Sequence, residues 1–441
     1  FKNQFFEPVD NTPLVLFRIA FGFLLAAEGF GAILTGWVKS NFIIPKYHFP
    51  FIAFDWIQPL PGNGMYVYFI ALGCFGLLMM LGLYYRIAAI GYFLLWTGAY
   101  LMQKTSYNNH YYLMVLFTFI MIFLPANKNL SLDSKLGRIA RSSFCYSGIF
   151  WIFIAQSAVF YIYASVAKWN PDWIGFRSVE ILFSGKLDYP IIGPLLAQKW
   201  FQITIAVGGI AFDFLIVPIL LWKRTRIFGL IAALFFHLFN SFIFQIGIFP
   251  YMALGLIIFF YSGEELRNFL SKFRIKIPRT EISHTEINEV GQKLIISAFL
   301  IWFFIQLILP LRHHLIEGDV NWTEEGHRMS WRMMLRSKSG YVNFKVIDSK
   351  ENRIRIINPM DYLTPKQAHR VAVRPDFCWQ FVQILKEEFG DDVKIFADGK
   401  VSLNGSPMMR LYKNDYDLSN VKWEPYKHAE WLSSYNKQPS K

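Results

Sequence analysis

The sequence predicts an α-helical polytopic membrane bundle of about nine transmembrane helices, followed by a small, mainly β extracytoplasmic domain. The 441 residues are 54% hydrophobic, 18% aromatic and only 17% charged, and their mean hydropathy is +0.30. Apolar residues occur in blocks of about twenty, the length of helix that crosses a bilayer. After residue 311 these blocks give way to short alternating segments that are typical of strands. This composition excludes intrinsic disorder and argues against an ordinary soluble enzyme.

A window of about 19 residues finds nine apolar segments, which we interpret as transmembrane helices. Within the long block 227–262, polar and helix-breaking residues mark a break midway, and we divide the block there. These residues are Asn240, Ser241, Gln245, Gly247 and Pro250. The nine segments lie near residues 12–36, 65–85, 87–103, 110–125, 147–167, 200–222, 227–244, 247–262 and 293–311. Residues 1–311 therefore form the predicted membrane domain.

The charges of the loops orient these segments in the membrane. With a cytoplasmic N-terminus, the inside segments carry 14 Lys and Arg residues and the outside loops carry 7. The positive-inside rule favours this orientation. The net charge of +13 lies mostly between apolar blocks and in the last third, which membrane topology and anionic lipid explain better than nucleic-acid binding.

Residues 312–441 form the predicted extracytoplasmic domain. Residues 376–389 fit one helix. Four other segments alternate like strands, namely 341–347, 353–358, 393–396 and 409–412. We therefore expect a mainly β unit that sits on the membrane bundle.

Among the ionisable residues inside predicted spans, four matter most: Arg18, Glu28, Asp213 and His237. A charge in a span is expensive unless it is paired or faces water, so each residue is a functional candidate. For Arg18 and Asp213 we favour a structural explanation, a helix end or a pairing with a neighbour. For Glu28, which lies deeper, the structural and functional interpretations remain equal.

A polar cluster, KTSYNNHYYL at 104–113, lies between the third and fourth spans. On spacing alone it fits a hydrated turn with an aromatic belt. Asn109 and His110, however, open the next helix, where their side chains suit the orientation of a polar substrate. Both interpretations stay open.

A second cluster, KWNPDW at 168–173, closes the fifth span. A lysine at a helix end most often extends toward the interface. If Lys168 instead turns inward, burial disfavours the ammonium form and yields a neutral amine that can act as a base near neutral pH.

A third cluster follows the last span at 321–338. Soft apolar side chains beside arginines there could line a site that receives a lipid ring and a carboxylate. Ordinary packing between the outer domain and the membrane is the alternative. The residues concerned are Trp331, Arg332, Met333, Met334 and Arg336.

These motifs resemble the vitamin K-dependent gamma-glutamyl carboxylase family and its bacterial relatives with an HTTM domain. The resemblance extends over nearly the whole chain, and its motifs occur in the family's order. It rests on KTSYNNHYYL at 104–113, Lys-x-x-x-Asp-Trp from Lys168 to Trp173, FHLFNSFIFQIGIF at 236–249, and NWT followed by SWRMM at 321–334. Residues 1–311 would then be an HTTM-like catalytic domain.

The resemblance implies an integral-membrane enzyme of the carbon–carbon ligase type. Its cofactor would be reduced vitamin K, a phylloquinone or menaquinone hydroquinone, which O₂ converts to the epoxide. The coupled step removes a γ-proton from a glutamyl side chain, and CO₂ then adds to the carbanion. The implied partners are the lipid bilayer, a membrane quinone and a glutamate-containing peptide or protein, with no nucleic acid and no metal. The bacterial relatives imply the bacterial inner membrane.

The resemblance also implies roles for individual residues. Lys168 stands at the family's catalytic lysine, and Asn109 and His110 stand at its Asn-His pair, which would hold the quinone oxygens or stabilise the carbanion. Trp331 and Arg336 fall in the glutamate-recognition region. The residues implied to bind the cofactor are Asn109, His110, Lys168, His237, Asn240, Met333 and Met334.

Other functions remain as alternatives. Arg332 and Arg336 stand where the animal motif has an acidic residue and a histidine, so the chain could epoxidise the quinol without carboxylating peptides. A non-catalytic lipid-binding scaffold, with Lys168 at the interface, is the alternative from another class. A haem quinol oxidase ranks lowest because only His237 lies well within a span.

Overall fold

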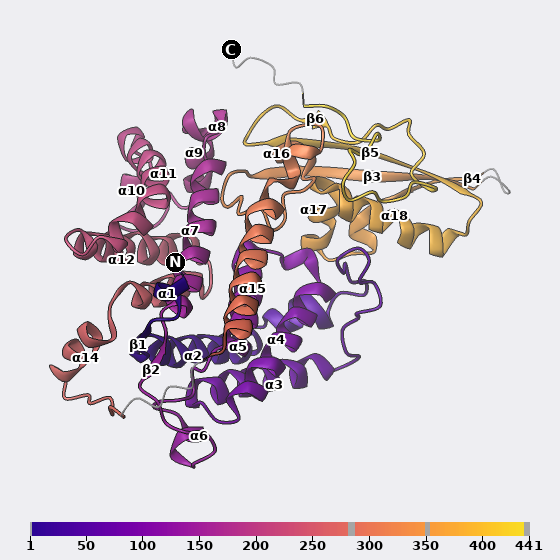
Figure 1. The fold of residues 1–441 in the computed structure, drawn as a ribbon. Helices are drawn as coiled ribbons and strands as arrows, with labels where there is room; N and C mark the ends of the chain where they lie inside the picture. Colours follow the sequence, from indigo (N-terminus) through magenta and orange to yellow (C-terminus); the bar gives the residue numbers. More distant parts are fainter. Residues whose placement is uncertain (1, 281–286, 349–352, 436–441) are drawn as a thin grey trace.

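The computed structural model describes residues 2–280, 287–348 and 353–435. Helices fill the first three quarters of the chain, and an α+β unit follows at one end of the molecule (Figure 1). The helical part also holds a two-stranded antiparallel sheet, in which β1 (Pro8–Asp10) pairs with β2 (Phe144–Tyr146).

Six helices of the described chain are long and apolar enough to cross a membrane, which makes the chain an integral membrane protein. They are α2 (Thr12–Leu34), α3 (Gly64–Leu81), α7 (Gly148–Ala167), α11 (Lys199–Leu221), α12 (Arg226–Phe244) and α15 (Glu289–Ile308), the last continued by a 3₁₀ turn to Leu315. The predicted count of nine is not confirmed.

The three remaining predicted spans are helical but do not meet the requirements for length and hydropathy. They are α4 (Tyr85–Met102), α5 (Asn109–Phe123) and α13 (Phe249–Leu256), the last continued by a 3₁₀ turn to Phe260. With 15 and 8 residues, α5 and α13 are shorter than the roughly 20 residues that cross a bilayer. Arg86 and several tyrosines lower the hydropathy of α4. A hydropathy window therefore locates these helices without establishing that they span.

Helices α2 and α3 lie in close backbone contact along their length. A Cβ atom on Gly22 would lie 2.4 Å from the backbone nitrogen of Met80, and one on Gly76 would lie 2.4 Å from that of Ala26. Small residues permit such approach between membrane helices, where dispersion contacts replace the hydrophobic effect as the attractive force.

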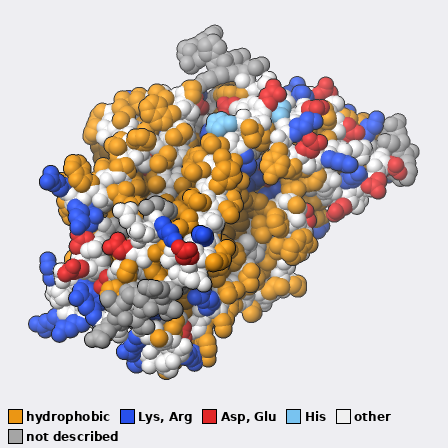
Figure 2. Space-filling view, viewed as in Figure 1, with side chains coloured by type: hydrophobic (Ala, Val, Ile, Leu, Met, Phe, Trp, Pro, Cys, Tyr) orange, Lys and Arg blue, Asp and Glu red, His pale blue; other side chains and the backbone are white. Residues whose placement is uncertain are grey.

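The surface of the helical part is apolar. Figure 2 shows hydrophobic side chains over most of this part, with Lys and Arg gathered toward the region of α14 (Gly263–Ser271). Outward-facing residues such as Leu34, Phe228 and Phe304 are strongly exposed. In water such a surface would be unfavourable, so lipid is the solvent that this surface fits.

The C-terminal unit contains a four-stranded antiparallel sheet in the order β4-β3-β5-β6. The strands are β3 (Lys338–Asp348), β4 (Arg353–Ile357), β5 (Val393–Leu403) and β6 (Met409–Arg410). All four segments predicted as strands overlap these elements, and the predicted helix lies within α18 (Pro375–Phe389). One face of the sheet is buried through residues such as Val342, Phe344 and Ile395.

The description of this unit as mainly β is corrected by a second helix, α17 (Pro365–Val373), which the sequence analysis missed. Thr364 and Gln367 form a capping box, and Pro365 occupies the first turn, a combination typical of helix N-termini. Helices α17 and α18 lie between the sheet and the membrane bundle (Figure 1). The unit is therefore α+β, and its helices face the bundle.

A buried ionic cluster joins the two parts of the molecule. Asp376 of α18 forms ion pairs with Lys104, between α4 and α5, at 2.5 Å and with Arg328 at 2.9 Å. Burial alone would raise the pKa of the Asp376 carboxyl, but Arg328 and Lys104 hold it well below its usual range. Burial also lowers the pKa of Lys104 to about 8, against the opposing effect of Asp376.

Replacing Asp376 by Asn should destabilise the protein strongly, because Lys104 and Arg328 would remain buried without a carboxylate. We expect the free energy of unfolding to fall by about 3–5 kcal/mol. Thermal unfolding of the detergent-solubilised protein measures this as a lower Tm. The matched control is Asp391→Asn, whose carboxylate lies 3.6 Å from Lys386 but is 94% exposed. Equal Tm values for the two variants would contradict the assignment.

The same cluster predicts a pH dependence. The pKa of Asp376 is lower in the folded chain than the unfolded value of about 3.9. Its stabilisation is therefore present above about pH 4 and is lost as pH falls through the folded-state pKa. Asp376→Asn should remove this acid-sensitive contribution to the Tm.

Candidate functional site

An apolar cavity lies between α7, α11 and α12, and residues 333–334 close it from the side of the C-terminal unit. Aromatic and aliphatic side chains form most of its walls. The cavity brings together six of the seven residues that the sequence analysis expected to bind a cofactor, namely His110, Lys168, His237, Asn240, Met333 and Met334. The seventh, Asn109, lies beside this cavity in the neighbouring chamber described below.

Lys168 turns inward at the C-terminal end of α7. Its side chain is only 8% exposed, and its ammonium nitrogen donates to a carboxylate oxygen of Asp213 and to the carbonyl of Ala164 at 3.3 Å. The nitrogen also lies 5.5 Å from the centre of the Trp173 ring. The pairing expected for Asp213 is present, and its partner is the proposed catalytic lysine. An amine and a carboxylate thus form a buried acid–base pair within the cavity wall.

His237 of α12 is fully buried beside this pair. Its Nε2 atom and the Tyr161 hydroxyl are hydrogen-bonded at 2.7 Å. Its Nδ1 atom is buried and has no partner among the described residues. Buried polar atoms are nearly always paired in folded proteins, so this ring nitrogen is available to a polar atom of a ligand.

Asn109 and His110 occupy the first turn of α5. Asn108 caps this helix by accepting from the backbone nitrogen of Tyr111 at 2.8 Å, which fixes the two following side chains. The His110 ring stacks on Phe249 with 4.1 Å between ring centroids. Asn109 donates to the carbonyl of Arg332 at 3.4 Å, so the turn also holds residues far along the chain.

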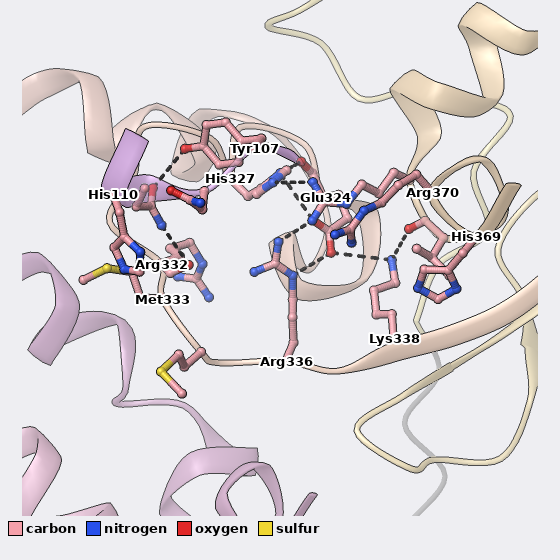
Figure 3. Close-up of a pocket in the computed structure, with 15 residues that line it drawn as sticks. Tyr107, His110, Glu324, His327, Arg332, Met333, Arg336, Lys338, His369 and Arg370 are labelled. Atoms are coloured by element: carbon pink, nitrogen blue, oxygen red, sulfur yellow. Dashed lines mark hydrogen bonds and ion pairs between the residues drawn. The ribbon is translucent and has the colours of Figure 1, made fainter. Parts of the chain in front are cut away.

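A second cavity, which we call the basic chamber, opens between the bundle and the C-terminal unit (Figure 3). His110, Met333 and Met334 line both cavities. Its charged and titratable walls come from the segment after the last helix of the bundle and from α17, and they comprise Glu324, His327, Arg332, Arg336, Lys338, His369, Arg370 and Arg374. An apolar cavity and a strongly basic one therefore share a wall.

Glu324 organises one part of the basic chamber. Arg336 donates to both of its carboxylate oxygens, with Nε at 2.5 Å from Oε1. Burial alone would raise the pKa of Glu324, but Arg336 and His327 hold it well below its usual range. Lys338 lies 3.8 Å from Glu324, yet burial lowers the pKa of this lysine to about 7.

The shared wall belongs to a segment with unusual backbone geometry. Met329, Trp331 and Met334 have φ angles of 57°, 55° and 56°, a region that costs residues other than glycine about 1–3 kcal/mol each. Trp331 lies outside both cavities and packs in the core, with its ring 5.2 Å from that of Tyr112. The Tyr107 hydroxyl accepts from the backbone nitrogen of Met329 at 2.6 Å. These contacts hold the segment in place, so Trp331 acts as an anchor of the wall.

Two family models match the chain. Residues 6–264 match the model described as HTTM domain, and residues 291–438 match the model described as vitamin K-dependent gamma-carboxylase, lumenal domain. The chain belongs to the vitamin K-dependent gamma-carboxylase family. No solved structure matches it. Family membership supports a carboxylase-like function, implies a vitamin K hydroquinone cofactor, and indicates that the C-terminal domain is extracytoplasmic.

Several residues at the cavities of this carboxylase-family chain escaped the sequence analysis. Tyr161 and Phe249 are ordinary apolar-span residues by pattern, and only packing brings them to His237 and His110. The basic residues of α17 were missed with the helix itself. The capping box formed by Thr364 and Gln367, with Pro365 in the first turn, was a usable signal for this helix.

Two other candidates in the spans have local explanations. Arg18 is fully buried and donates to the carbonyls of Ala126 at 2.9 Å and Asn129 at 3.1 Å, so it fixes the loop after α5, as the structural explanation expected. Glu28 is hydrogen-bonded to Tyr111. Neither residue lines the two cavities.

The Lys168–Asp213 pair should be visible in stability measurements on this carboxylase-family protein. Either Lys168→Met or Asp213→Asn leaves the other charge buried and should cost about 3–5 kcal/mol, whereas the double variant should recover most of that loss. Thermal unfolding of the parent protein, the two single variants and the double variant gives the coupling free energy between Lys168 and Asp213. Lys199 and Glu180, an exposed pair at 3.9 Å, provide a control cycle with no expected coupling. If the losses of unfolding free energy from the two single substitutions add up in the double variant, Lys168 and Asp213 do not interact.

Proposed function

We propose that this protein couples oxygenation of a reduced naphthoquinone to its epoxide with carboxylation of glutamyl side chains. The observation that carries the proposal is the wall of His110, Met333 and Met334 that the apolar cavity and the basic chamber share. A flat apolar quinol suits the first cavity, and an anionic side chain suits the second. The wall would bring the two reactants within reach of each other.

The residues of the apolar cavity fit a quinol. Aromatic side chains line it, and a bicyclic aromatic ring packs well against such walls. The unpartnered Nδ1 atom of His237 and the Lys168–Asp213 pair are polar groups that the two ring oxygens could meet. When bound, the reduced vitamin K supplies the electrons and the ring carbons that O₂ oxygenates.

Lys168 is the proposed base that accepts the proton of the quinol hydroxyl. The ammonium must first release its own proton, and the Asp213 carboxylate is the adjacent acceptor. That transfer turns an ion pair into a neutral pair without changing the net charge of the cavity, and burial favours neutral forms. The amine then takes the quinol proton, and the apolar walls exclude competing water.

The proposed glutamyl site lies in the basic chamber, at the end next to His110. Arg332 is the nearest candidate to hold the carboxylate, because Arg336 already forms two hydrogen bonds with Glu324. His110 in the shared wall would stabilise the charge that develops on the γ-carbon. Asn109 positions this arrangement through its bond to the Arg332 carbonyl.

We further propose a cytoplasmic N-terminus, a domain boundary near residue 311 and location in a bacterial inner membrane. Loop charges support the orientation. In that orientation the basic chamber, which the C-terminal unit helps to form, opens on the extracytoplasmic side. Substrates would therefore reach it after export.

The proposal predicts two products from one reaction mixture. Purified protein with reduced naphthoquinone, O₂, labelled bicarbonate and a glutamate-containing peptide should yield quinone epoxide and labelled peptide. Lys168→Ala should lower both rates by about 10²–10⁴-fold, the usual contribution of a general base. The exposed residue Lys199 provides the control, since Lys199→Ala should keep both activities.

The products that form distinguish between the possible functions. Epoxide without labelled peptide would restrict the activity to quinol oxygenation for that peptide. Full activity of a folded Lys168→Ala protein would exclude the amine as the base, and a non-catalytic lipid-binding role would give neither product.

A further inference from the structure

The basic chamber holds far more positive charge than one glutamyl carboxylate requires. Five arginine and lysine side chains line it, namely Arg332, Arg336, Lys338, Arg370 and Arg374, and Glu324 is its single carboxylate among the residues that the structure describes. Glu324 is already engaged by Arg336 and Lys338. The surplus positive charge therefore lies on the three other arginines.

Among the described residues, two of these arginines have uncharged partners. Arg332 donates to the side-chain oxygen of Asn321 at 2.9 Å, and Arg374 lies 3.4 Å from the Nε2 atom of His327. Within the described residues, no ion pair joins Arg332, Arg370 or Arg374 to a carboxylate. The Nε atoms of Arg332 and Arg370 are buried without a hydrogen-bond partner there.

The surplus positive charge is divided between two ends of the basic chamber. Figure 3 shows Arg332 beside His110 and Met333 at one end, and Arg370 with His369 and Lys338 at the other. The first end belongs to the wall shared with the apolar cavity. The second lies at the C-terminal end of α17, where Arg370 is in the last turn and Arg374 is the residue that follows the helix.

The cations at the α17 end repel one another. Burial together with Arg370 and other nearby arginines lowers the pKa of Arg374 to about 9, against the opposing effect of Glu324. Burial and then Arg370, Arg374 and Lys338 lower the pKa of His369. An anion bound at this end would relieve the repulsion, so the arrangement favours an occupied state.

We propose that the basic chamber binds its substrate through two carboxylates, one at the Arg332–His110 end and a second at the Arg370–Arg374 end. The proposal rests on the proposed function, in which the first carboxylate belongs to the reacting glutamyl residue. The second belongs to the same peptide, either as a neighbouring acidic side chain or as its C-terminal carboxylate. The substrate class is thus an acidic peptide, and α17 supplies the subsite that selects it.

Direct binding to the full-length protein in detergent tests this proposal without any turnover. Three fluorescent peptides serve as probes: one glutamate with an amidated C-terminus, two acidic residues with an amidated C-terminus, and one glutamate with a free C-terminus. At least one peptide with two carboxylates should bind about tenfold more tightly than the first. Which of them does so identifies the source of the second carboxylate. Added salt should reduce this difference in affinity between the peptides with one and two carboxylates.

Variants locate the second subsite. Arg370→Gln should raise the Kd of the tightly bound peptide about tenfold and leave the Kd of the single-carboxylate peptide nearly unchanged. Arg370→Lys, which keeps the charge, should retain most of the preference. Lys345→Gln is the matched control, because Lys345 is an exposed cation on the sheet of the same unit, and it should change neither Kd. A Tm equal to that of the parent protein establishes that each variant is folded.

Equal affinity for all three peptides would overturn the proposal, as would an equal loss for all peptides in folded Arg370→Gln. Because the measurement needs neither quinol nor CO₂, it is read independently of carboxylation. A preference for two carboxylates in a protein that carboxylates no peptide would support the subsite and count against the proposed function alone.

Discussion

The buried carboxylate of Asp376 is the contact on which the arrangement of both cavities depends. Lys104, one of its partners, precedes the turn that carries Asn109 and His110. Arg328, the other, immediately precedes the segment that carries Met333 and Met334. The same carboxylate therefore fixes both sides of the shared wall. Its low pKa, which two nearby cations maintain in a buried position, keeps this carboxylate charged at every pH near neutrality.

The ion pairs of Asp376 help to explain why a strained backbone segment persists between the two cavities. Residues 329–334 contain three left-handed non-glycine residues, and such strain survives only when the surroundings determine the backbone fully. The packing of Trp331 in the core and the hydrogen bond from Asn109 to the Arg332 carbonyl hold the backbone of this segment in place. This strained segment places Met333 and Met334 in the lining of both cavities.

The two cavities differ in polarity, and each suits a different reactant of the proposed reaction. Apolar walls disfavour charge, which suits a neutral quinol and an acid–base pair that exchanges a proton internally. The arginines and Lys338 of the basic chamber suit an anion, which charge-assisted hydrogen bonds would hold. In the proposed reaction, this arrangement would keep the base away from water while the acidic substrate stays in a polar site. Burying Lys168 and Asp213 together keeps the membrane part free of an isolated charge.

Much of this protein was already determined by local sequence. Blocks of apolar residues and alternating segments follow from which solvent each stretch must face, so they predicted the membrane bundle, all four strands and α18. The resemblance carried by the motifs at Asn109, Lys168 and His237 likewise predicted the family. Tertiary structure alone decided that Lys168 pairs with Asp213, that Trp331 lies in the core, and that Arg370 and Arg332 line one chamber. Hydropathy and periodicity describe neighbours along the chain, whereas these contacts join positions tens of residues apart through packing that no local pattern encodes.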